Sequence, residues 1–298
     1  MKCCGSELLI KGRLIKVGHL DSDRYDAVTS PSEVALEIGK IPARVDIFTF
    51  MQIMPDTSPR FAYAMEMDNL AILPVSTFED WWDNRIRSYP RNRARQAEKK
   101  GVVLREVPFD HSLVAGIHTV FNETRVRQGR PNSHYGMDLD AVRRHIGTFL
   151  DRSIFIAAFF EEKLIGFAKM VIDKSGTQAS LMTVEAMIGH REKAPTNALI
   201  AHCVRACASR GLPYLMYQHM VYGNKEPDGI AHFKKINGFE QVDLPRYYIP
   251  LTPLGRFALR YGLHHSLAEQ LPKPLAAKLR QFRNAWYNRK LQPETEGS

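Results

Sequence analysis

The stretch DGIAHFKKINGF, residues 228–239, decides how the second half of this chain folds. Its spacing predicts a short helix whose last turn carries Phe233 and Lys234. The pair Asn237-Gly238 then ends the helix, because glycine readily adopts the left-handed conformation that closes a helix C-terminus. A helix that stops before a strand is common in folded proteins, so this segment gains its meaning from the elements around it.

Strand-like and helix-like runs alternate around this segment. The sequence predicts strands at 179–188 (ASLMTVEAMI), 212–221 (LPYLMYQHMV) and 246–250 (RYYIP), and a helix at 196–210 (TNALIAHCVRACASR). This order resembles the second half of the GNAT acyltransferase fold. The ending F-K-x-x-x-G-F resembles in particular the Fem-type branch, which transfers aminoacyl groups in peptidoglycan synthesis. Ordinary acetyltransferases of the superfamily usually carry a tyrosine where this chain has Lys234.

The resemblance covers about residues 101–250. Upstream, the sequence predicts a strand at 101–107, helices at 111–127 and 138–150, and a hairpin of strands 153–160 and 163–173. The hairpin strands are apolar almost throughout, which predicts burial on both faces, and Gly166 predicts a bulge or a close backbone approach. The expected fold class is α+β (α/β layered), with a GNAT-like mixed twisted sheet and flanking helices. In that sheet the strands 179–188 and 212–221 are expected to be parallel neighbours.

The first hundred residues have a different pattern. Residues 45–54 and 61–75 are β-rich, and residues 76–100 predict a helix with a strongly basic end, RNRARQAEKKG. Fem-type proteins place a similar basic helix just before their second GNAT-like unit. The expected division is a smaller β-rich partial GNAT-like unit at 1–75, a basic connecting helix at 76–100, a GNAT-like acyltransferase domain at 101–252 and a helical, basic amphipathic tail at 253–298.

Charge and composition narrow the class of partner. A net charge of +9 and a pI near 9.4 favour an anionic partner such as a nucleotide, a phospholipid surface or RNA. No stretch reaches the roughly 20 apolar residues of a membrane-spanning helix, and the N-terminus lacks the apolar core of a signal peptide. The protein is expected to be cytoplasmic, and peripheral contact with the inner face of the membrane is a second possibility. Cys203 and Cys207 are one helical turn apart and are expected to be buried as small hydrophobes.

The donor-binding loop departs from the superfamily pattern. GNAT enzymes that use acyl-CoA hold its pyrophosphate on backbone N–H groups at a helix start, in a loop of form Q/R-x-x-G-x-G/A. The equivalent segment here is 191–196 (REKAPT), in which Pro195 removes one N–H donor. The resemblance assigns donor binding to Arg191, Lys193, Thr196 and Asn197, with either of the last two capping the helix. It implies no tightly bound cofactor and leaves acyl-CoA and aminoacyl-tRNA open as donor substrates.

Acyl transfer to an amine needs positive charge near the tetrahedral oxyanion and groups that move protons. The resemblance places Lys234 in this site. Tyr247 and Tyr248 point to opposite faces of the closing strand, so one of them is expected in the site as a hydrogen-bond donor. Glu185, on a central strand, stands where many members place a general base. The alternative for Glu185 is an outward-pointing strand residue.

The loop NETRVRQGRPNSHYG, residues 122–136, contains few apolar residues, which is typical of a binding loop and equally of a surface connection. In the GNAT fold this loop overhangs the substrate groove. The substrate-binding residues expected are Glu123, Arg125, Arg127, Gln128, Tyr135 and Phe233. The histidines, including the adjacent His264 and His265, show no ligand spacing such as H-E-x-x-H, so no metal site is expected.

The C-terminal tail carries a further pattern. Leu275, Leu279, Phe282 and Trp286 recur at helical spacing among basic residues. Such an amphipathic helix predicts either a membrane-surface segment or a helix docked on its own protein.

Two functional classes follow from the sequence. The resemblance implies an N-acyltransferase that moves an acyl or aminoacyl group from a thioester or a tRNA ester to an amine. The acceptor would be a small molecule or a lipid-linked cell-envelope or polysaccharide precursor. The alternative is a catalytically inactive GNAT-fold module that binds a membrane surface, RNA or a partner protein. Fold alone does not separate the two.

Overall fold

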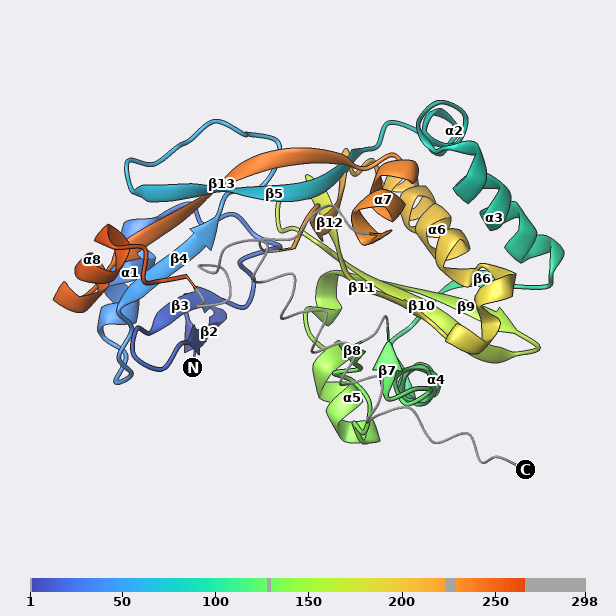
Figure 1. Ribbon diagram of the computed structural model, residues 1–298, viewed down its shortest axis with the longest axis horizontal. Coiled ribbons are helices and arrows are strands. Elements are labelled where there is room, and N and C mark those ends of the chain that lie inside the picture. The colour runs from blue at the N-terminus through green and yellow to red at the C-terminus, as the bar shows by residue number, and fades with distance from the viewer. Residues whose placement is uncertain (1, 128–129, 223–228, 266–298) are drawn as a thin grey trace.

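The computed structural model describes residues 2–127, 130–222 and 229–265 of the 298-residue chain. Within these residues, eleven strands form one mixed sheet in the order β1-β2-β3-β4-β13-β5-β12-β11-β10-β9-β6 (Figure 1). Its strands are β1 (Lys2–Cys3), β2 (Ser6–Lys11), β3 (Val17–Leu20), β4 (Ile47–Met51), β5 (Ala64–Pro74), β6 (Val103–Val107), β9 (Ser153–Phe160), β10 (Lys163–Ile172), β11 (Gln178–Ala186), β12 (Tyr214–His219) and β13 (Glu240–Pro250).

The remaining elements flank this sheet. The α-helices are α1 (Pro31–Gly39), α2 (Phe78–Asp80), α3 (Ser88–Lys99), α4 (His111–Phe121), α5 (Leu139–Ile146), α6 (Pro195–Ser209), α7 (Gly229–Ile236) and α8 (Pro253–Arg260). Shorter helical turns are η1 (Trp81–Arg85), η2 (Leu150–Arg152) and η3 (Ile188–Lys193), and β7 (Val126–Arg127) pairs with β8 (Arg130–Pro131) in a separate small hairpin. The mixed α/β architecture agrees with the expected fold class.

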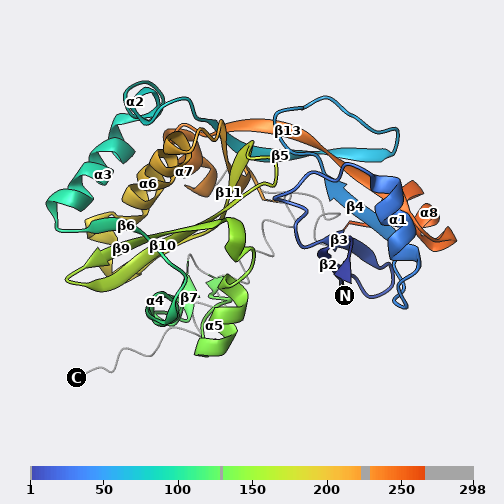
Figure 2. The same ribbon diagram turned by 180° about the vertical axis from the view of Figure 1, so that it is seen from behind.

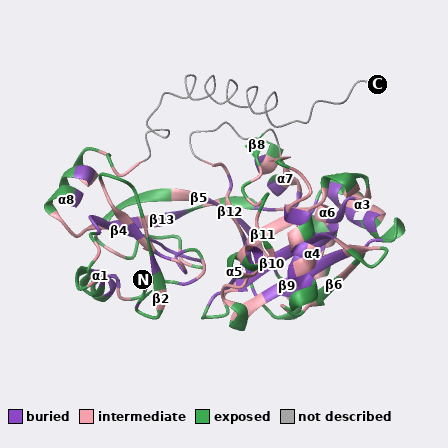
Figure 3. Ribbon diagram, turned by 90° about the horizontal axis from the view of Figure 1, so that it is seen from below, coloured by how far each residue is buried: buried purple, intermediate pink, exposed green. Residues whose placement is uncertain are grey.

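Helices cover both faces of β9, β10 and β11. α3 and α6 lie on one face and α4 and α5 on the other, as both views show (Figures 1 and 2). One hydrophobic core includes Met170 and Leu199 on the α6 side, and a second includes Phe121 and Phe167 on the α4 side. Burial runs along β9 and β10 in Figure 3. The prediction that the two apolar hairpin strands are covered on both faces is therefore confirmed.

The hairpin between β9 and β10 has the predicted turn and the predicted irregularity. Glu161 and Glu162 both have left-handed backbone angles, with φ of 49° and 59°, which matches the twist of a two-residue hairpin turn. The pairing of β10 with β9 shifts register between Leu164 and Gly166. A Cβ atom on Gly166 would lie 2.8 Å from the Cβ of Ala186 on β11. Gly166 is therefore both a bulge position and a close approach between strands.

The two central strands of the C-terminal half separate at one end. β11 and β12 are parallel neighbours, as predicted, but residues 178–180 and 214–216 are the only register pairs recorded between them. β12 is irregular beyond this point, because its register with β5 shifts between Met216 and His219 and Gln218 has a φ of 49°. We call this opening the splay and define it by residues 181–186 of β11 and 217–219 of β12.

The N-terminal and C-terminal parts of the chain share one sheet. β13, which contains the predicted closing strand 246–250, lies between β4 and β5 and pairs with both in antiparallel fashion. β5 in turn pairs with β12. The long strands β5 and β13 run between the two halves of the molecule in Figure 1. The division into domains at residues 75, 100 and 252 stays a proposal. In it, the strands β5 and β13 join the N-terminal unit 1–75 to the GNAT-like domain 101–252.

The helix predicted at 76–100 is interrupted. Thr77 accepts a hydrogen bond from the Asp80 N–H and caps α2, and α3 begins only at Ser88. Between them the fully buried Trp81 donates from its indole nitrogen to the carbonyl of Asn237, 2.8 Å away. This contact fastens the segment to the end of α7, and the change of direction at Ile86 follows from it.

Only part of the tail lies within the described residues. Its first section forms α8, whereas the predicted amphipathic stripe 275–286 lies outside them. Within the described residues, none of the helices combines the length and the apolar character needed to span a membrane.

Candidate functional site

Lys234 is fully buried at the end of α7 and reaches the splay. Its Nζ donates to the carbonyl oxygens of Tyr217, 2.7 Å away, and His219, 2.6 Å away. It also lies 3.5 Å from the hydroxyl of Tyr222 and 4.5 Å from the centre of the Tyr217 ring. Hydrogen bonds from a charged donor are stronger than neutral ones. Lys234 therefore holds the two carbonyls on either side of the irregular Gln218.

Gln218 connects the two edges of the splay. Its Nε2 donates to the carbonyl oxygen of Met182 on β11 at 3.3 Å, and its Oε1 accepts a hydrogen bond from the Tyr222 hydroxyl at 3.0 Å. Because Tyr222 also lies beside the Lys234 ammonium, a chain of polar contacts runs from β11 across the splay to α7.

Glu185 lies in the β11 part of the splay. It is paired with Phe167 of β10 and so projects toward the face covered by α4 and α5. Its carboxylate forms an ion pair with Arg127, and His134 Nδ1 lies 3.4 Å from its second oxygen. Arg127 also donates to the carbonyl of Ala186. All three side chains are largely buried, with 13–23% exposure, so the carboxylate is held in a defined position.

Aromatic contacts fix the histidine of this cluster. The ring of His134 stacks on Phe121 with centroids 4.1 Å apart, and His145 lies 5.1 Å from it. Burial lowers the pKa of His145, and the neighbouring His134 and Lys169 lower it further.

Tyr247 and Tyr248 do not lie beside Lys234. Tyr247 is fully buried in the N-terminal core, where its hydroxyl accepts from the Arg60 N–H at 2.7 Å. Tyr248 pairs with Ala64 of β5, whereas His219 pairs with Leu70. These positions are six residues apart on β5, which corresponds to roughly 20 Å along the strand. The alternation of the two tyrosines is as expected, but neither is brought to the splay.

The predicted donor loop has a different cap from the one expected. Ala194, with a φ of 55°, is the N-cap of α6 and makes no side-chain capping bond, so neither Thr196 nor Asn197 caps the helix. A residue without glycine's freedom thus occupies a left-handed position. Arg191 is exposed, and its carbonyl accepts from the Arg93 guanidinium of α3 at 2.9 Å. The loop is thereby fastened to the basic helix.

Lys193 in the same loop is partly neutralised. Its Nζ lies 2.6 Å from a carboxylate oxygen of Glu192 and 4.4 Å from the centre of the Phe160 ring. Lys100, the residue that follows α3, donates from its Nζ to the Glu192 carbonyl at 3.0 Å. The loop therefore combines basic side chains with an acidic one, beside a helix start whose first N–H groups lack intrahelical partners.

The predicted substrate-binding residues divide into three groups. Glu123 accepts hydrogen bonds from the N–H groups of Ile188 and Gly189 at 2.7 and 2.8 Å, and so fastens the end of α4 to η3. Arg125 contacts Tyr135 near the surface. The other residues are placed as follows: Arg127 beside Glu185, Phe233 packed against the α6-side core, and Gln128 outside the described residues.

The structure adds residues that the sequence analysis did not select. One group lies at the splay: His134 contacts Glu185, and Gln218 joins Met182 to Tyr222. A second group forms where the carboxylate of Glu66 on β5 meets the adjacent pair His264-His265. The His-His pair was visible in the sequence, but its acidic partner lies 198 residues away from His264. No local spacing rule could have found that group.

Comparison with known proteins supports the fold. No model of a protein family matches the sequence, and no curated protein matches it. FemX is similar over 85% of this chain and 86% of its own, with 10% identity and a TM-score of 0.59. The C-terminal domain of an Agrobacterium fabrum protein described as a lysylphosphatidylglycerol synthetase is similar over 85% and 82%, with 14% identity and a TM-score of 0.55.

A third similar structure is L-PGS from Bacillus licheniformis, which shares 13% identity over 86% of each chain with a TM-score of 0.53. At these identities the likeness concerns the fold. The resemblance stated from the sequence is confirmed at that level, since the chain adopts a GNAT/Fem-like fold.

Proposed function

We propose that this protein is an N-acyltransferase that moves an aminoacyl or acyl group from an activated ester to an amine. The observation that carries the proposal is the pair of charged groups at the splay. The buried carboxylate of Glu185 is held on the β11 side by Arg127, and the buried ammonium of Lys234 is held on the β12 side. A fold whose known members transfer acyl groups thus has its charged groups where two central strands part.

These groups match the steps of the reaction. The amine nitrogen attacks the ester carbonyl carbon, and Glu185 accepts the proton that the nitrogen loses. Arg127 and His134 keep the carboxylate in place. Lys234 contributes positive charge near the carbonyl oxygen, which becomes negative in the tetrahedral intermediate. That intermediate collapses to the amide and releases the alcohol or thiol of the donor, which takes up the proton.

The loop at the start of α6 favours an aminoacyl-tRNA over acyl-CoA as donor. Its left-handed position is an alanine, Pro195 removes one N–H, and Glu192 places a carboxylate beside Lys193. Each change weakens a compact pyrophosphate cradle. The basic face of α3 next to this loop suits a longer polyanion such as RNA. FemX and the lysylphosphatidylglycerol synthetase domain, which share the fold, support an aminoacyl donor by analogy.

The acceptor we propose is an amine of a cell-envelope precursor. The name of one structural neighbour refers to lysylphosphatidylglycerol, and FemX is similar in fold over 85% of this chain. The net charge of +9 supports approach to anionic lipid. A cytoplasmic enzyme in peripheral contact with the inner membrane face would meet such acceptors.

The alternative is a binding module without catalysis. The observation that favours it is the complete burial of Lys234, whose ammonium holds two main-chain carbonyls. A lysine with that role can stabilise the irregular strand without touching substrate. RNA, a membrane surface or a partner protein would then be the ligand.

The test is to offer the full chain two labelled donors in parallel, acetyl-CoA and aminoacyl-tRNA, with and without an amine acceptor. Acceptor-dependent loss of label from aminoacyl-tRNA is the expected result. Turnover of acetyl-CoA instead would support the transferase proposal but show that the donor is acyl-CoA rather than aminoacyl-tRNA. Tight binding of tRNA or lipid without turnover of either label, for any amine offered, would support the module and end the enzyme proposal.

A further inference from the structure

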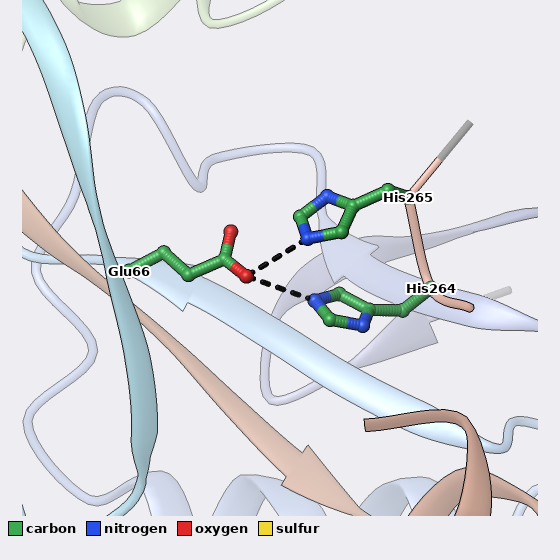
Figure 4. A group of neighbouring side chains, drawn as sticks. All are labelled: Glu66, His264 and His265. Atoms are coloured by element: carbon green, nitrogen blue, oxygen red, sulfur yellow. Dashed lines mark hydrogen bonds and ion pairs between the residues drawn. The ribbon is translucent and has the colours of Figure 1, made fainter. Parts of the chain in front are cut away.

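A second group of reactive side chains lies outside the splay. Glu66 on β5 and the pair His264-His265, in the turn after α8, meet at one point (Figure 4). His264 Nε2 lies 3.2 Å and His265 Nε2 lies 2.9 Å from the same carboxylate oxygen, Oε1 of Glu66. One ligand atom from each of the three residues lies within 4.8 Å of the other two.

These distances are close to those of a bound transition metal. Ligand atoms about 2.0–2.1 Å from a tetrahedral ion lie about 3.3–3.4 Å from one another. The separations of 3.2 and 2.9 Å between the ring nitrogens and the carboxylate oxygen therefore need shifts of only a few tenths of an ångström. Two imidazoles and one carboxylate suit zinc and its neighbours rather than magnesium or calcium, which prefer oxygen ligands alone.

Neighbouring groups hold the three ligands in position. The Tyr248 hydroxyl donates to the other oxygen of Glu66 at 3.3 Å, and its ring packs edge-on against His264 at 4.7 Å. A hydrogen bond to a ligating carboxylate is a common feature of protein metal sites. Tyr248 thus has a place in this group rather than at the splay.

The group is open to solvent on one side. The His264 side chain is 6% exposed, whereas those of His265 and Glu66 are 34% and 43% exposed. Nδ1 of His264 is buried without a hydrogen-bond partner, so Nε2 is the ring nitrogen through which His264 meets the group. An ion can enter from the side of His265 and Glu66.

We propose that Glu66, His264 and His265 bind one zinc-type divalent ion, with a fourth position left for water or an exogenous ligand. In the metal-free state the ring Nε2–H groups donate to the carboxylate. To bind the ion, each imidazole offers the lone pair of Nε2, and its proton is carried on Nδ1 or, from a doubly protonated ring, released to solvent. The bound ion fastens the segment after α8 to β5. This site is independent of the acyl-transfer proposal, because none of its ligands lies at the splay.

The test uses the full chain, stripped with a chelator and titrated with Zn²⁺ by calorimetry. One ion per chain is expected, with affinity reduced at least about tenfold in Glu66→Gln and in His265→Ala. Both side chains are partly exposed, so both variants are expected to fold. His111→Ala, which removes an exposed histidine on α4, is the matched control and leaves the affinity unchanged.

A second measurement is independent of the calorimetric signal. Zn²⁺ is expected to raise the Tm of the wild type and of His111→Ala by several degrees, and to leave the Tm of the two ligand variants nearly unchanged. Co²⁺ in place of Zn²⁺ is expected to show the visible absorption of a four-coordinate ion. Equal Zn²⁺ affinity in all four proteins, or no stoichiometric binding by the wild type, would overturn the site.

Discussion

Two regions of this molecule contain a fully buried lysine, and they differ in what surrounds it. Lys169 on β10 donates from Nζ to main-chain carbonyls at the C-terminal end of α5, and its ammonium faces the ring of Phe155. Lys234 on α7 donates to two carbonyls of β12. Lys169 lies where a helix packs on a sheet, whereas Lys234 lies where the sheet opens.

This difference shows that burial and carbonyl hydrogen bonds do not identify a catalytic lysine. Both lysines satisfy carbonyl groups that would otherwise be buried without a partner, which is a structural role. What separates them is position, because Lys234 lies beside the opening between β11 and β12, whereas Lys169 lies within a helix–sheet contact. The proposed mechanism therefore distinguishes the two lysines by location and predicts different outcomes for the same substitution.

The largest effect is expected for Lys234→Met. Removing one group that stabilises an oxyanion lowers turnover by roughly 100- to 1,000-fold. Two buried carbonyls lose their donor in this variant, so the Tm is expected to fall by several degrees. Activity is therefore compared per folded molecule, with the folded fraction followed by circular dichroism.

Lys235→Met is the matched control, because the neighbouring side chain is exposed. It is expected to keep both its Tm and its turnover. If folded Lys234→Met were as active as this control, Lys234 would have no catalytic role. Both buried lysines would then have a structural role only.

The second effect concerns the opposite edge of the splay. Glu185→Gln keeps the shape of the side chain but removes the proton acceptor, and turnover is expected to fall by about 100-fold. The loss should appear in kcat more than in KM, because the change affects the chemical step. Glu162→Gln, in the exposed turn between β9 and β10, is the control. A Glu185→Gln enzyme of unchanged kcat would limit Glu185 to its ion pair with Arg127.

A smaller and different effect is expected for Lys169→Met. The change removes the donor to the carbonyls after α5, so the Tm is expected to fall by a few degrees. Turnover per folded molecule should stay within about threefold of the wild type, since Lys169, although it pairs with Thr183 of β11, is enclosed between β10 and the carbonyls after α5. A loss comparable to that of Lys234→Met, measured below the Tm of both variants, would contradict the assignment by location.

The smallest effect is a pH dependence of stability. Burial lowers the pKa of Lys169 from 10.5 to about 8, although its carbonyl partners favour the ammonium. Between these values the unfolded chain binds more protons than the folded one at this position, so this group makes the free energy of unfolding rise with pH, by at most ~1.4 kcal/mol per pH unit. Urea unfolding at pH 7.5 and 9.5 should show a smaller rise for Lys169→Met than for the wild type. If the free energy of unfolding rose equally with pH in the two proteins, the lowered pKa of Lys169 would be contradicted.

The sequence predicted the fold because local patterns determine most of it. The apolar strands around Glu161-Glu162, the bulge at Gly166 and the helix that precedes β12 each follow from spacing or turn chemistry, and each agrees with the structure. Cys203 and Cys207 are buried free thiols, as expected from their place on an apolar helix face.

The site was less predictable because it depends on contacts between distant residues. Tyr247 and Tyr248 looked suitable by alternation, but β13 pairs with β4 and carries them into the N-terminal half. The cap at Ala194 depends on a left-handed backbone that side-chain chemistry does not reveal. His134 is selected by its stacking on Phe121, a tertiary contact that no spacing rule describes.

The position of β13 has a consequence for the order of events during synthesis. β4 and β5 leave the ribosome early, yet the strand that lies between them, β13, begins 166 residues after the end of β5. Until then the apolar segment IFTFM of β4 and the neighbouring β5 have unpaired edges, which invite pairing with other chains. A nascent chain of this protein thus spends most of its translation with the edges of β4 and β5 unpaired, and we expect residues 47–74 to need chaperone protection during that interval.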